Sequence, residues 1–290
     1  MMKIRIYCFF LVLLLIACKQ KDSTEYYPNG NIKSITSLEN QVAHGLFTDY
    51  YENGNLRSEV IYVDGLKNGL STLYYPSENK YSTSEILWKN DSAYYQKNYD
   101  VGRRLVNEGS VFQYDQRIGK WNFYDQKESL SEVKEFINVK DGSYLNQHWI
   151  LNDKKDTIGG NYYKLKLTPI DSNRTIRFHF LLKRPLLLNN SELFVCLPKD
   201  KNLKEDFSNE NKIKWDTIDN MARRFKDQSK YLNRNYDVIF DIDVKDLKVK
   251  PLKGYLLESQ KVEKDSFDTV TRKIYFNIPY DRLANTKINY

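Results

Sequence analysis

An internal repeat of about 24 residues runs through the first half of this 290-residue chain. The motif YYPNGN at residues 26–31 returns as YYENGN at residues 50–55, and a third copy begins with YYP at residue 74. A second motif keeps the same spacing, since HGL at residues 44–46 is followed by NGL at residues 68–70. Weaker copies follow near residues 98–102 and 119–124. A period of this length predicts small identical units that stack side by side.

Turn residues divide each unit into two short strands. Asn53-Gly54 is a strong hairpin signal, and we expect a type I′ turn with positive φ at both residues. Asp64-Gly65 supplies a second turn, and residues 46–51 and 56–63 are rich in β-forming residues. A hairpin alone is marginal in water, so several copies must pair. Residues 26–160 are therefore predicted to form a single-layer antiparallel meander.

The second unit carries a recognisable pattern, Tyr-Tyr-x-Asn-Gly-x-Leu-Lys-x-Glu followed by Gly-x-x-x-Gly. The matching residues are Tyr50, Tyr51, Asn53, Gly54, Leu56, Arg57, Glu59, Gly65 and Gly69. This pattern resembles MORN-type repeats in their bacterial variant. The resemblance implies a repeat sheet over residues 26–160. It also implies a possible role, because some members resemble antitoxins that neutralise a partner toxin.

The N-terminus has the pattern of an export signal. Lys3 and Arg5 precede an apolar run at residues 6–17, which is shorter than the roughly 20 residues that span a membrane. The sequence LIAC at residues 15–18 resembles the lipobox of bacterial lipoproteins, in which the cysteine is lipidated. We therefore expect a signal peptide at residues 1–17, lipidation of Cys18 and a tether at residues 18–25. An ordinary cleaved signal with an accidental cysteine is the alternative.

Lipidation would place the protein on a membrane through Cys18. Lys19 follows the cysteine, and no aspartate occupies that position to retain the protein at the inner membrane. The expected location is the cell envelope, at the outer membrane of a Gram-negative bacterium. The formal net charge of +7 is scattered along the chain. An exported protein does not meet nucleic acid, so nucleic acid is not an expected partner.

The chain changes character at about residue 161, where the repeats stop and longer strands begin. Alternating and β-branched residues predict strands at residues 162–167, 175–181, 192–197, 236–244 and 273–278. Residues 161–290 are therefore predicted to form an antiparallel β-sandwich of immunoglobulin-like size. Residues 221–230 are the one segment with a helical pattern. The fold class is all-β.

The tyrosine pairs are the candidate partner-binding residues. Adjacent strand residues point to opposite faces, so each pair sends one ring to each side of the sheet. Aromatic side chains are favoured at interfaces because they bury a large area and keep a polar tip. The candidates for one groove are Tyr51, Tyr75, Trp121 and Tyr124. The alternative is structural, with these rings packing across strands.

Residues with catalytic or metal-binding chemistry are scattered. His44, His148 and His179 belong to no metal or triad motif, and Cys196 in an apolar strand is expected to be a buried thiol. The acidic strand face formed by Asp237, Asp241 and Asp243 could bind Ca²⁺, although charged outer faces are common. No cofactor or resident metal is predicted, and a catalytic role has weak support.

Three functional hypotheses remain open. The first is a lipid-anchored envelope protein that binds or scaffolds a protein or glycan partner. The second is an immunity-type protein that neutralises a toxin. The third is a glycan-acting hydrolase with carboxylates that the sequence does not pair.

Overall fold

The computed structural model describes residues 21–76, 82–112, 116–170, 175–187, 190–199, 202–243, 245, 250–261 and 269–284. The predicted signal peptide and Cys18 lie outside these residues. The chain divides into two compact units, residues 1–92 and 93–290. No helix among the described residues is long and apolar enough to cross a membrane.

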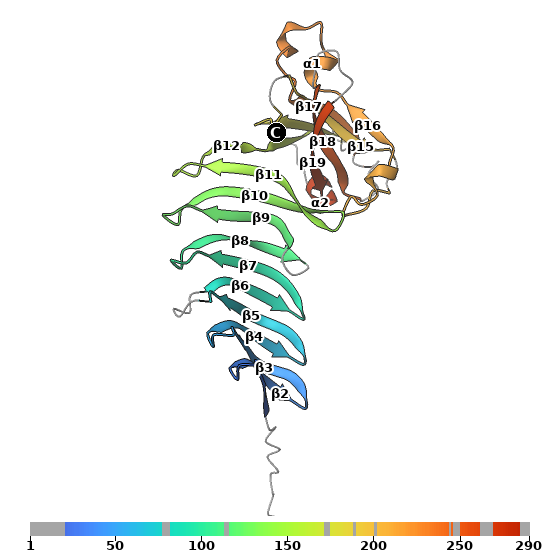
Figure 1. Ribbon diagram of the computed structural model, residues 1–290. Helices are drawn as coiled ribbons and strands as arrows, with labels where there is room; N and C mark the ends of the chain where they lie inside the picture. The colour runs from blue at the N-terminus through green and yellow to red at the C-terminus, as the bar shows by residue number, and fades with distance from the viewer. Residues whose placement is uncertain are drawn as a thin grey trace, which may run out of the picture. The chain divides into compact units, whose positions relative to one another are not determined.

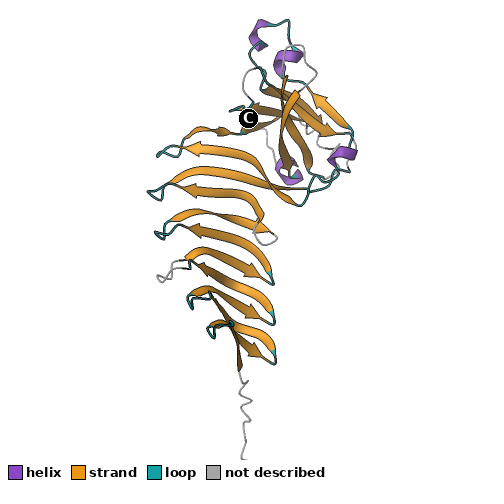
Figure 2. Ribbon diagram, in the orientation of Figure 1, coloured by secondary structure: helices purple, strands orange, loops and turns teal. Residues whose placement is uncertain are grey.

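Strands dominate the described chain, and the predicted all-β class is confirmed (Figures 1 and 2). Twelve strands pair in sequence order as an antiparallel meander. They are β1 (Lys21–Tyr26), β2 (Ile32–Glu39), β3 (Val42–Tyr50), β4 (Leu56–Val63), β5 (Leu66–Tyr74), β6 (Ser82–Lys89), β7 (Ser92–Tyr99), β8 (Leu105–Phe112), β9 (Gln116–Tyr124), β10 (Leu130–Val139), β11 (Gly142–Leu151) and β12 (Thr157–Asn161).

Strand β1 begins within the segment predicted to be a tether. It pairs with β2 from Lys21 opposite Leu38 to Tyr26 opposite Ile32, and all six of its residues are exposed. Pairing satisfies backbone groups of β2 that would otherwise form an open sheet edge. The tether prediction is therefore wrong for residues 21–25.

The hairpins at one end of the strands use a three-residue loop. The backbone N–H of Gly54 donates to the Tyr51 carbonyl at 2.8 Å, and the Tyr51 N–H donates to the Asn55 carbonyl at 2.8 Å. Gly54 has φ of 86°, whereas Asn53 is not left-handed. This is a type I turn followed by a left-handed residue, so the prediction of a type I′ turn here was wrong. The same pair of hydrogen bonds recurs in the loops that begin at Tyr27, Asp100, Asp125 and Asn152.

Type I′ turns occupy the opposite ends of the strands. Asp64 and Gly65 join β4 to β5 with φ of 50° and 81°. Positive φ at two consecutive residues between paired strands defines this turn. Equivalent pairs with positive φ are Asn40-Gln41, Asn90-Asp91 and Lys140-Asp141.

A β-bulge follows each three-residue loop and marks the repeat even where its sequence has decayed. Asp49 lies opposite Ser58 and Tyr50 opposite Leu56, so Arg57 is the extra residue. A bulge bends the strand and increases its local twist. The corresponding extra residues in the other hairpins are Lys33, Thr83, Val106, Ser131 and Ile158. The repeat therefore continues through β12, and the weaker copies are genuine units.

The C-terminal part forms two further sheets. One has the order β13-β14-β17 and the other β16-β15-β18-β19. Their strands are β13 (Tyr163–Pro169), β14 (Thr175–Leu182), β15 (Glu192–Pro198), β16 (Trp215–Ile218), β17 (Asp237–Asp243), β18 (Leu252–Lys261) and β19 (Thr269–Ile278). The two sheets share one hydrophobic core, in which Phe178, Phe180, Leu193, Val195 and Leu256 are fully buried. The five predicted strands are present, whereas β16 and β18 were not predicted.

The helices are short and differ from the prediction. α1 (Met221–Arg224) ends where Phe225 forms the C-cap, so residues 221–230 are not one helix. Two 3-10 turns, Glu210–Lys212 and Ser229–Tyr231, and α2 (Tyr280–Ala284) complete the described helices. Only Met221 of α1 is buried, which leaves little apolar contact to extend it.

The left-handed loop position yields a stability prediction. Glu128 has φ of 58° at the position where Gly54 has 86°, and a side chain there is strained. Glu128→Gly should raise the free energy of unfolding by about 1 kcal/mol in urea denaturation followed by tryptophan fluorescence. The matched control is Lys127→Gly in the same loop, which should lower it by roughly 0.5–1 kcal/mol. Destabilisation by both substitutions would contradict the strained conformation.

Candidate functional site

The side chains of Tyr51 and Tyr75 make contacts within the protein itself. The Tyr51 hydroxyl donates to the Tyr74 carbonyl at 2.9 Å, just as the Tyr27 hydroxyl donates to the Tyr50 carbonyl at 2.7 Å. The second tyrosine of a pair thus ties one repeat to the next. Tyr75 is half-buried and also engaged in an interaction.

Trp121 is a structural residue. Its side chain is fully buried, and its indole N–H donates to the Ser110 carbonyl at 2.7 Å. The Arg117 guanidinium lies 4.3 Å from the centre of the Trp121 ring. Gly109 lies opposite, where an added Cβ would sit 2.5 Å from the ring. The prediction that Trp121 lines an open groove is wrong, because the repeat covers it.

Tyr124 lies on the other face of the sheet from Trp121. Its hydroxyl donates to the Glu108 carboxylate at 2.5 Å. Glu108 pairs with Asn122 and Gly109 with Trp121, so alternation separates Glu108 and Trp121. Burial and the Glu108 carboxylate raise the pKa of Tyr124. The two residues therefore do not line one groove.

The same tyrosine–glutamate contact recurs in the N-terminal unit. The Tyr74 hydroxyl donates to the Glu59 carboxylate at 2.5 Å. Burial and this contact raise the pKa of Tyr74 to about 12. These hydroxyls hold neighbouring strands together and stay protonated at neutral pH.

A row of exposed aliphatic side chains crosses three strands of the N-terminal unit. Leu46 pairs with Ile61. Val60 pairs with Ser71, and Ile61 and Leu70 are the residues next to them in the two strands. Ile61 and Leu70 therefore both point to the face opposite that of Val60 and Ser71. The exposed fractions of Leu46, Ile61 and Leu70 are 45%, 44% and 44%. We call these three residues the aliphatic row. Contiguous exposed apolar side chains are typical of interaction sites.

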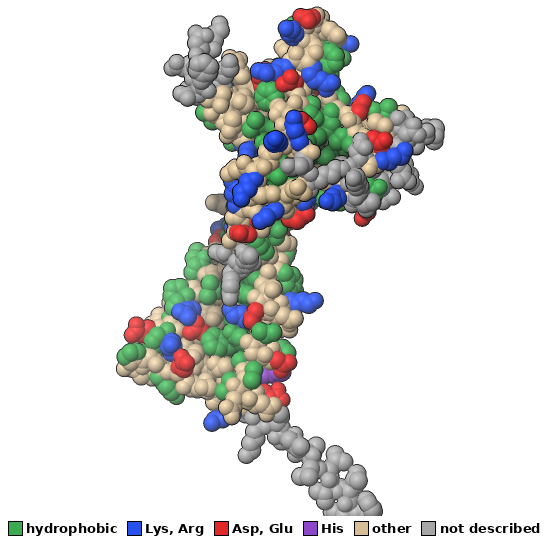
Figure 3. Space-filling view, turned by 90° about the vertical axis from the view of Figure 1, so that its right-hand side faces the viewer, with side chains coloured by type: hydrophobic (Ala, Val, Ile, Leu, Met, Phe, Trp, Pro, Cys, Tyr) green, Lys and Arg blue, Asp and Glu red, His purple; other side chains and the backbone are tan. Residues whose placement is uncertain are grey.

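Figure 3 shows that hydrophobic side chains also gather at the surface near the type I′ turns of these repeats. Val63 pairs with Leu66, and the two are 38% and 42% exposed. Exposed apolar surface therefore extends from the aliphatic row to the turns.

The last repeat uses the equivalent positions to hold the C-terminal sheets. Five residues before the last residue of the strand, β3, β5 and β9 each have a glycine, whereas β11 has Asn146. The residue that follows this position is Leu46 in β3, Leu70 in β5, Lys120 in β9 and Gln147 in β11. The Asn146 amide donates to the Tyr275 carbonyl at 3.0 Å and accepts the Tyr275 N–H at 2.8 Å. The Gln147 amide oxygen accepts the Tyr163 N–H at 3.0 Å. Both contacts lie within the second unit.

Glu210 is a buried carboxylate that strengthens this junction. It accepts hydrogen bonds from the ammonium groups of Lys140 at 3.0 Å and Lys273 at 2.9 Å, and from the Tyr275 hydroxyl at 3.1 Å. Burial alone would raise the pKa of Glu210, but the two ammonium groups outweigh it and the pKa is lowered. Tyr144 adds a hydroxyl contact to the Lys273 carbonyl at 2.7 Å.

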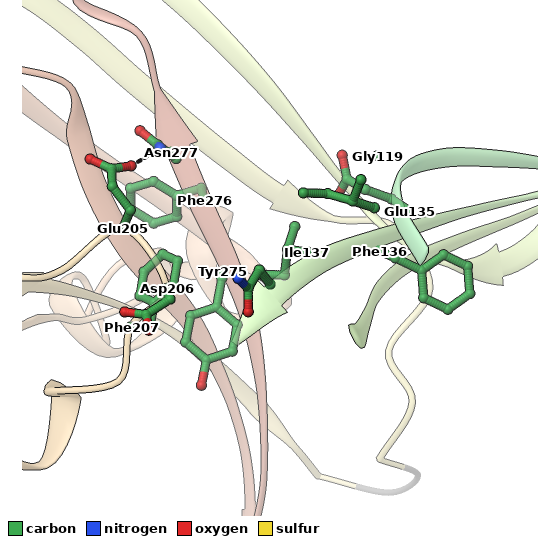
Figure 4. A pocket seen from close by; sticks show the side chains of 12 residues that line it. Gly119, Glu135, Phe136, Ile137, Glu205, Asp206, Phe207, Tyr275, Phe276 and Asn277 are labelled. Carbon is green, nitrogen blue, oxygen red and sulfur yellow. Dashed lines mark hydrogen bonds between the residues drawn. The ribbon is translucent and has the colours of Figure 1, made fainter. Parts of the chain in front are cut away.

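Two cavities adjoin the junction, and we call them together the junction groove. The first, of about 460 Å³, is largely apolar (Figure 4). The second, of about 370 Å³, is more polar and includes Lys120, Trp149 and Arg282. Both are lined by Glu135, Ile137, Tyr275, Phe276 and Asn277. The groove therefore lies between the last repeats and strand β19.

The three histidines each lie beside a carboxylate, Asp237 and Asp241 each pair with an arginine, and Asp243 accepts the backbone N–H of Lys245. The His148 Nε2 lies 2.9 Å from Glu132, and His179 contacts Asp237 on the sheet face away from buried Phe178. Arg177 donates two hydrogen bonds of 2.8 Å to Asp241. No group of three or more His, Cys, Asp or Glu side chains within the described residues is arranged to hold a metal.

Cys196 has the predicted environment. Its side chain is buried, and burial raises the pKa of its thiol. The Sγ atom lies 3.9 Å from the Thr217 hydroxyl. A protonated buried thiol is a packing residue, so this prediction is confirmed.

Sequence reasoning missed the aliphatic row and the junction groove. The row had a detectable signal, because Leu46 and Leu70 close the repeated HGL and NGL motifs. The groove had none, since Asn146 and Tyr275 are 129 residues apart.

Glu210 yields a pH-dependent prediction. Its lowered pKa means that its carboxylate stabilises the fold at neutral pH, and this contribution is lost as the pH falls through the folded-state pKa. Glu210→Gln should lower the unfolding free energy at pH 7 by about 1.5–3 kcal/mol in urea denaturation. The difference from the wild type should shrink in acid.

Asp216→Asn is the matched control, because Asp216 forms an exposed ion pair with Lys199 at 3.0 Å. It should cost about 0–1 kcal/mol. Equal losses for the two variants would show that Glu210 has no special role at the junction.

The comparison with protein families finds the MORN repeat variant at residues 19–40 and 43–64. No curated protein matches the chain. The matched residues cover the first repeats, from β1 to the end of β4. The N-terminal segment is thus similar to the MORN repeat variant, and the bulge pattern extends the repeat structurally to β12.

Proposed function

We propose that this protein is a lipid-anchored cell-envelope protein that presents its repeat sheet to a protein or glycan partner. The observation that carries the proposal is the shared position of Leu46, Leu70 and Gln147 in their repeats. In the last repeat this position contacts a folded domain through Gln147. In the first repeats it carries an exposed leucine.

Exposed aliphatic side chains on a stable sheet are suited to binding. Burial of apolar surface contributes about 25 cal/mol per Å², and the aliphatic row offers such surface without unfolding. The opposite face of the sheet buries Val60 on β4 and Trp88 on the neighbouring strand β6, so the sheet does not need the aliphatic row for its own packing. The row is therefore free to contact a partner.

The proposed location rests on the sequence. The basic start, the short apolar run and the LIAC motif favour export and lipidation of Cys18. An outer-membrane anchor would place the repeats, which begin three residues after Cys18, close to the lipid surface. A partner in the envelope is then the partner most readily met.

In-cell photo-crosslinking tests this function. A photoreactive amino acid at Leu70, in the membrane fraction of cells that make the lipidated protein, should yield one dominant adduct. The same amino acid at Ser71, which faces the other side of the sheet, is the matched control and should yield little.

Leu46→Asp with Ile61→Asp should abolish the adduct from position 70, because two carboxylates would have to be desolvated at the interface. Equal crosslinking from Leu70 and Ser71, or none from either, would contradict the proposal. A toxin as the captured partner would favour the immunity-type alternative.

A further inference from the structure

We propose that the junction groove binds an extended peptide that adds to the free edge of β19, with an apolar side chain in the first cavity and a carboxylate beside Lys120 and Arg282. The proposal rests on the proposed partner-binding function and assigns it a second surface. The aliphatic row and the junction groove belong to different units, so each can be tested without the other.

Among the described residues, no neighbouring strand pairs with the outer edge of β19, which faces the groove. It is the outer strand in the order β16-β15-β18-β19. Lys273 and Tyr275 direct backbone groups away from β18, since Tyr144 and Asn146 bond to them. Asn277 follows two residues later in the same register, so its N–H and carbonyl point the same way.

Asn146 shows that this edge accepts a strand-like partner. Its amide bonds to both the N–H and the carbonyl of Tyr275, as a residue of a neighbouring strand would. The ladder stops there within the described residues, and Asn277 lines both cavities. An extended peptide could continue the ladder, which is the geometry of β-strand addition.

The first cavity suits an apolar side chain. Ile118, Ile137 and Phe207 contribute to its lining, and its volume is about 460 Å³. Glu205 and Asp206 line the same cavity, where Glu205 is exposed and Asp206 is half-buried (Figure 4). An apolar residue flanked by a basic residue would complement this end.

The second cavity suits a carboxylate. Lys120 and Arg282 both line it and are exposed. Glu135 is also present, but its carboxylate already accepts hydrogen bonds from the amides of Asn146 at 2.8 Å and Gln147 at 2.7 Å. The described lining of this cavity therefore carries two cationic side chains and one hydrogen-bonded carboxylate. An acidic residue or the C-terminal carboxylate of a peptide matches this charge.

Selection from a displayed library of linear random peptides on the full-length protein tests the proposal. The expected ligands carry an apolar residue with a basic residue on one side and an acidic residue or a free C-terminus on the other. Asn277→Pro removes the outward N–H and should weaken the selected peptides about tenfold in fluorescence anisotropy. Proline is tolerated at such edge positions, so the strand should persist.

Thr271→Pro is the matched control, because Thr271 lies in the same strand and register but outside both cavities. It should leave affinity unchanged. Lys120→Gln with Arg282→Gln keeps the backbone intact and should weaken acidic peptides about tenfold, which tests the proposal even if Asn277→Pro fails to fold.

Failure to select any peptide, or equal affinity for the wild type and all these variants, would overturn the proposal. Binding of a glycan that Asn277→Pro does not weaken would also overturn it. Neither result would affect crosslinking from position 70. A failure of the groove proposal can therefore be distinguished from a failure of the proposed function.

Discussion

The side-chain amide of Asn146 takes the place of a neighbouring strand at the edge of β19. It satisfies the N–H and the carbonyl of Tyr275 at 2.8 and 3.0 Å, while Gln147 accepts the N–H of Tyr163. Two adjacent residues of one repeat thus bind both C-terminal sheets. The buried Glu210 adds charge-assisted bonds from Lys140 and Lys273 beside them. The junction groove exists because this contact holds β19 against the last repeats.

The repeats that carry this contact have no second layer within the described chain, so turn and bulge geometry must define them. Three-residue loops alternate with type I′ turns, and each loop is followed by one extra residue such as Arg57. Cross-strand packing then buries residues such as Trp121 against glycine. Because only part of each face is needed for packing, the remainder is available for contact. The Leu46 position illustrates this, since its counterpart in the last repeat holds a domain.

Local sequence signals predicted much of this fold. The 24-residue spacing and paired turn residues predicted the meander, and alternation around Phe178 and Phe240 predicted the sandwich strands. Strand β18 was missed because Gly254 and the buried Glu258 interrupt its pattern. The turn type predicted at Asn53-Gly54 was wrong because a bulge residue changes the length of the loop. No local propensity specifies that bulge. Trp121 was wrongly placed in an open groove because its burial depends on Gly109 in the neighbouring strand.

Amide hydrogen exchange of Tyr275 in the Asn146→Ala variant tests the central claim most directly. The Tyr275 N–H bonds only to Asn146 in the described structure, whereas the neighbouring Phe276 lies opposite Gly254 in the β18 ladder. The account predicts that the Tyr275 amide is protected in the wild type and loses protection selectively in the variant, while Phe276 stays protected. Unchanged protection of Tyr275 in Asn146→Ala, or rapid exchange of Tyr275 in the wild type, would contradict it.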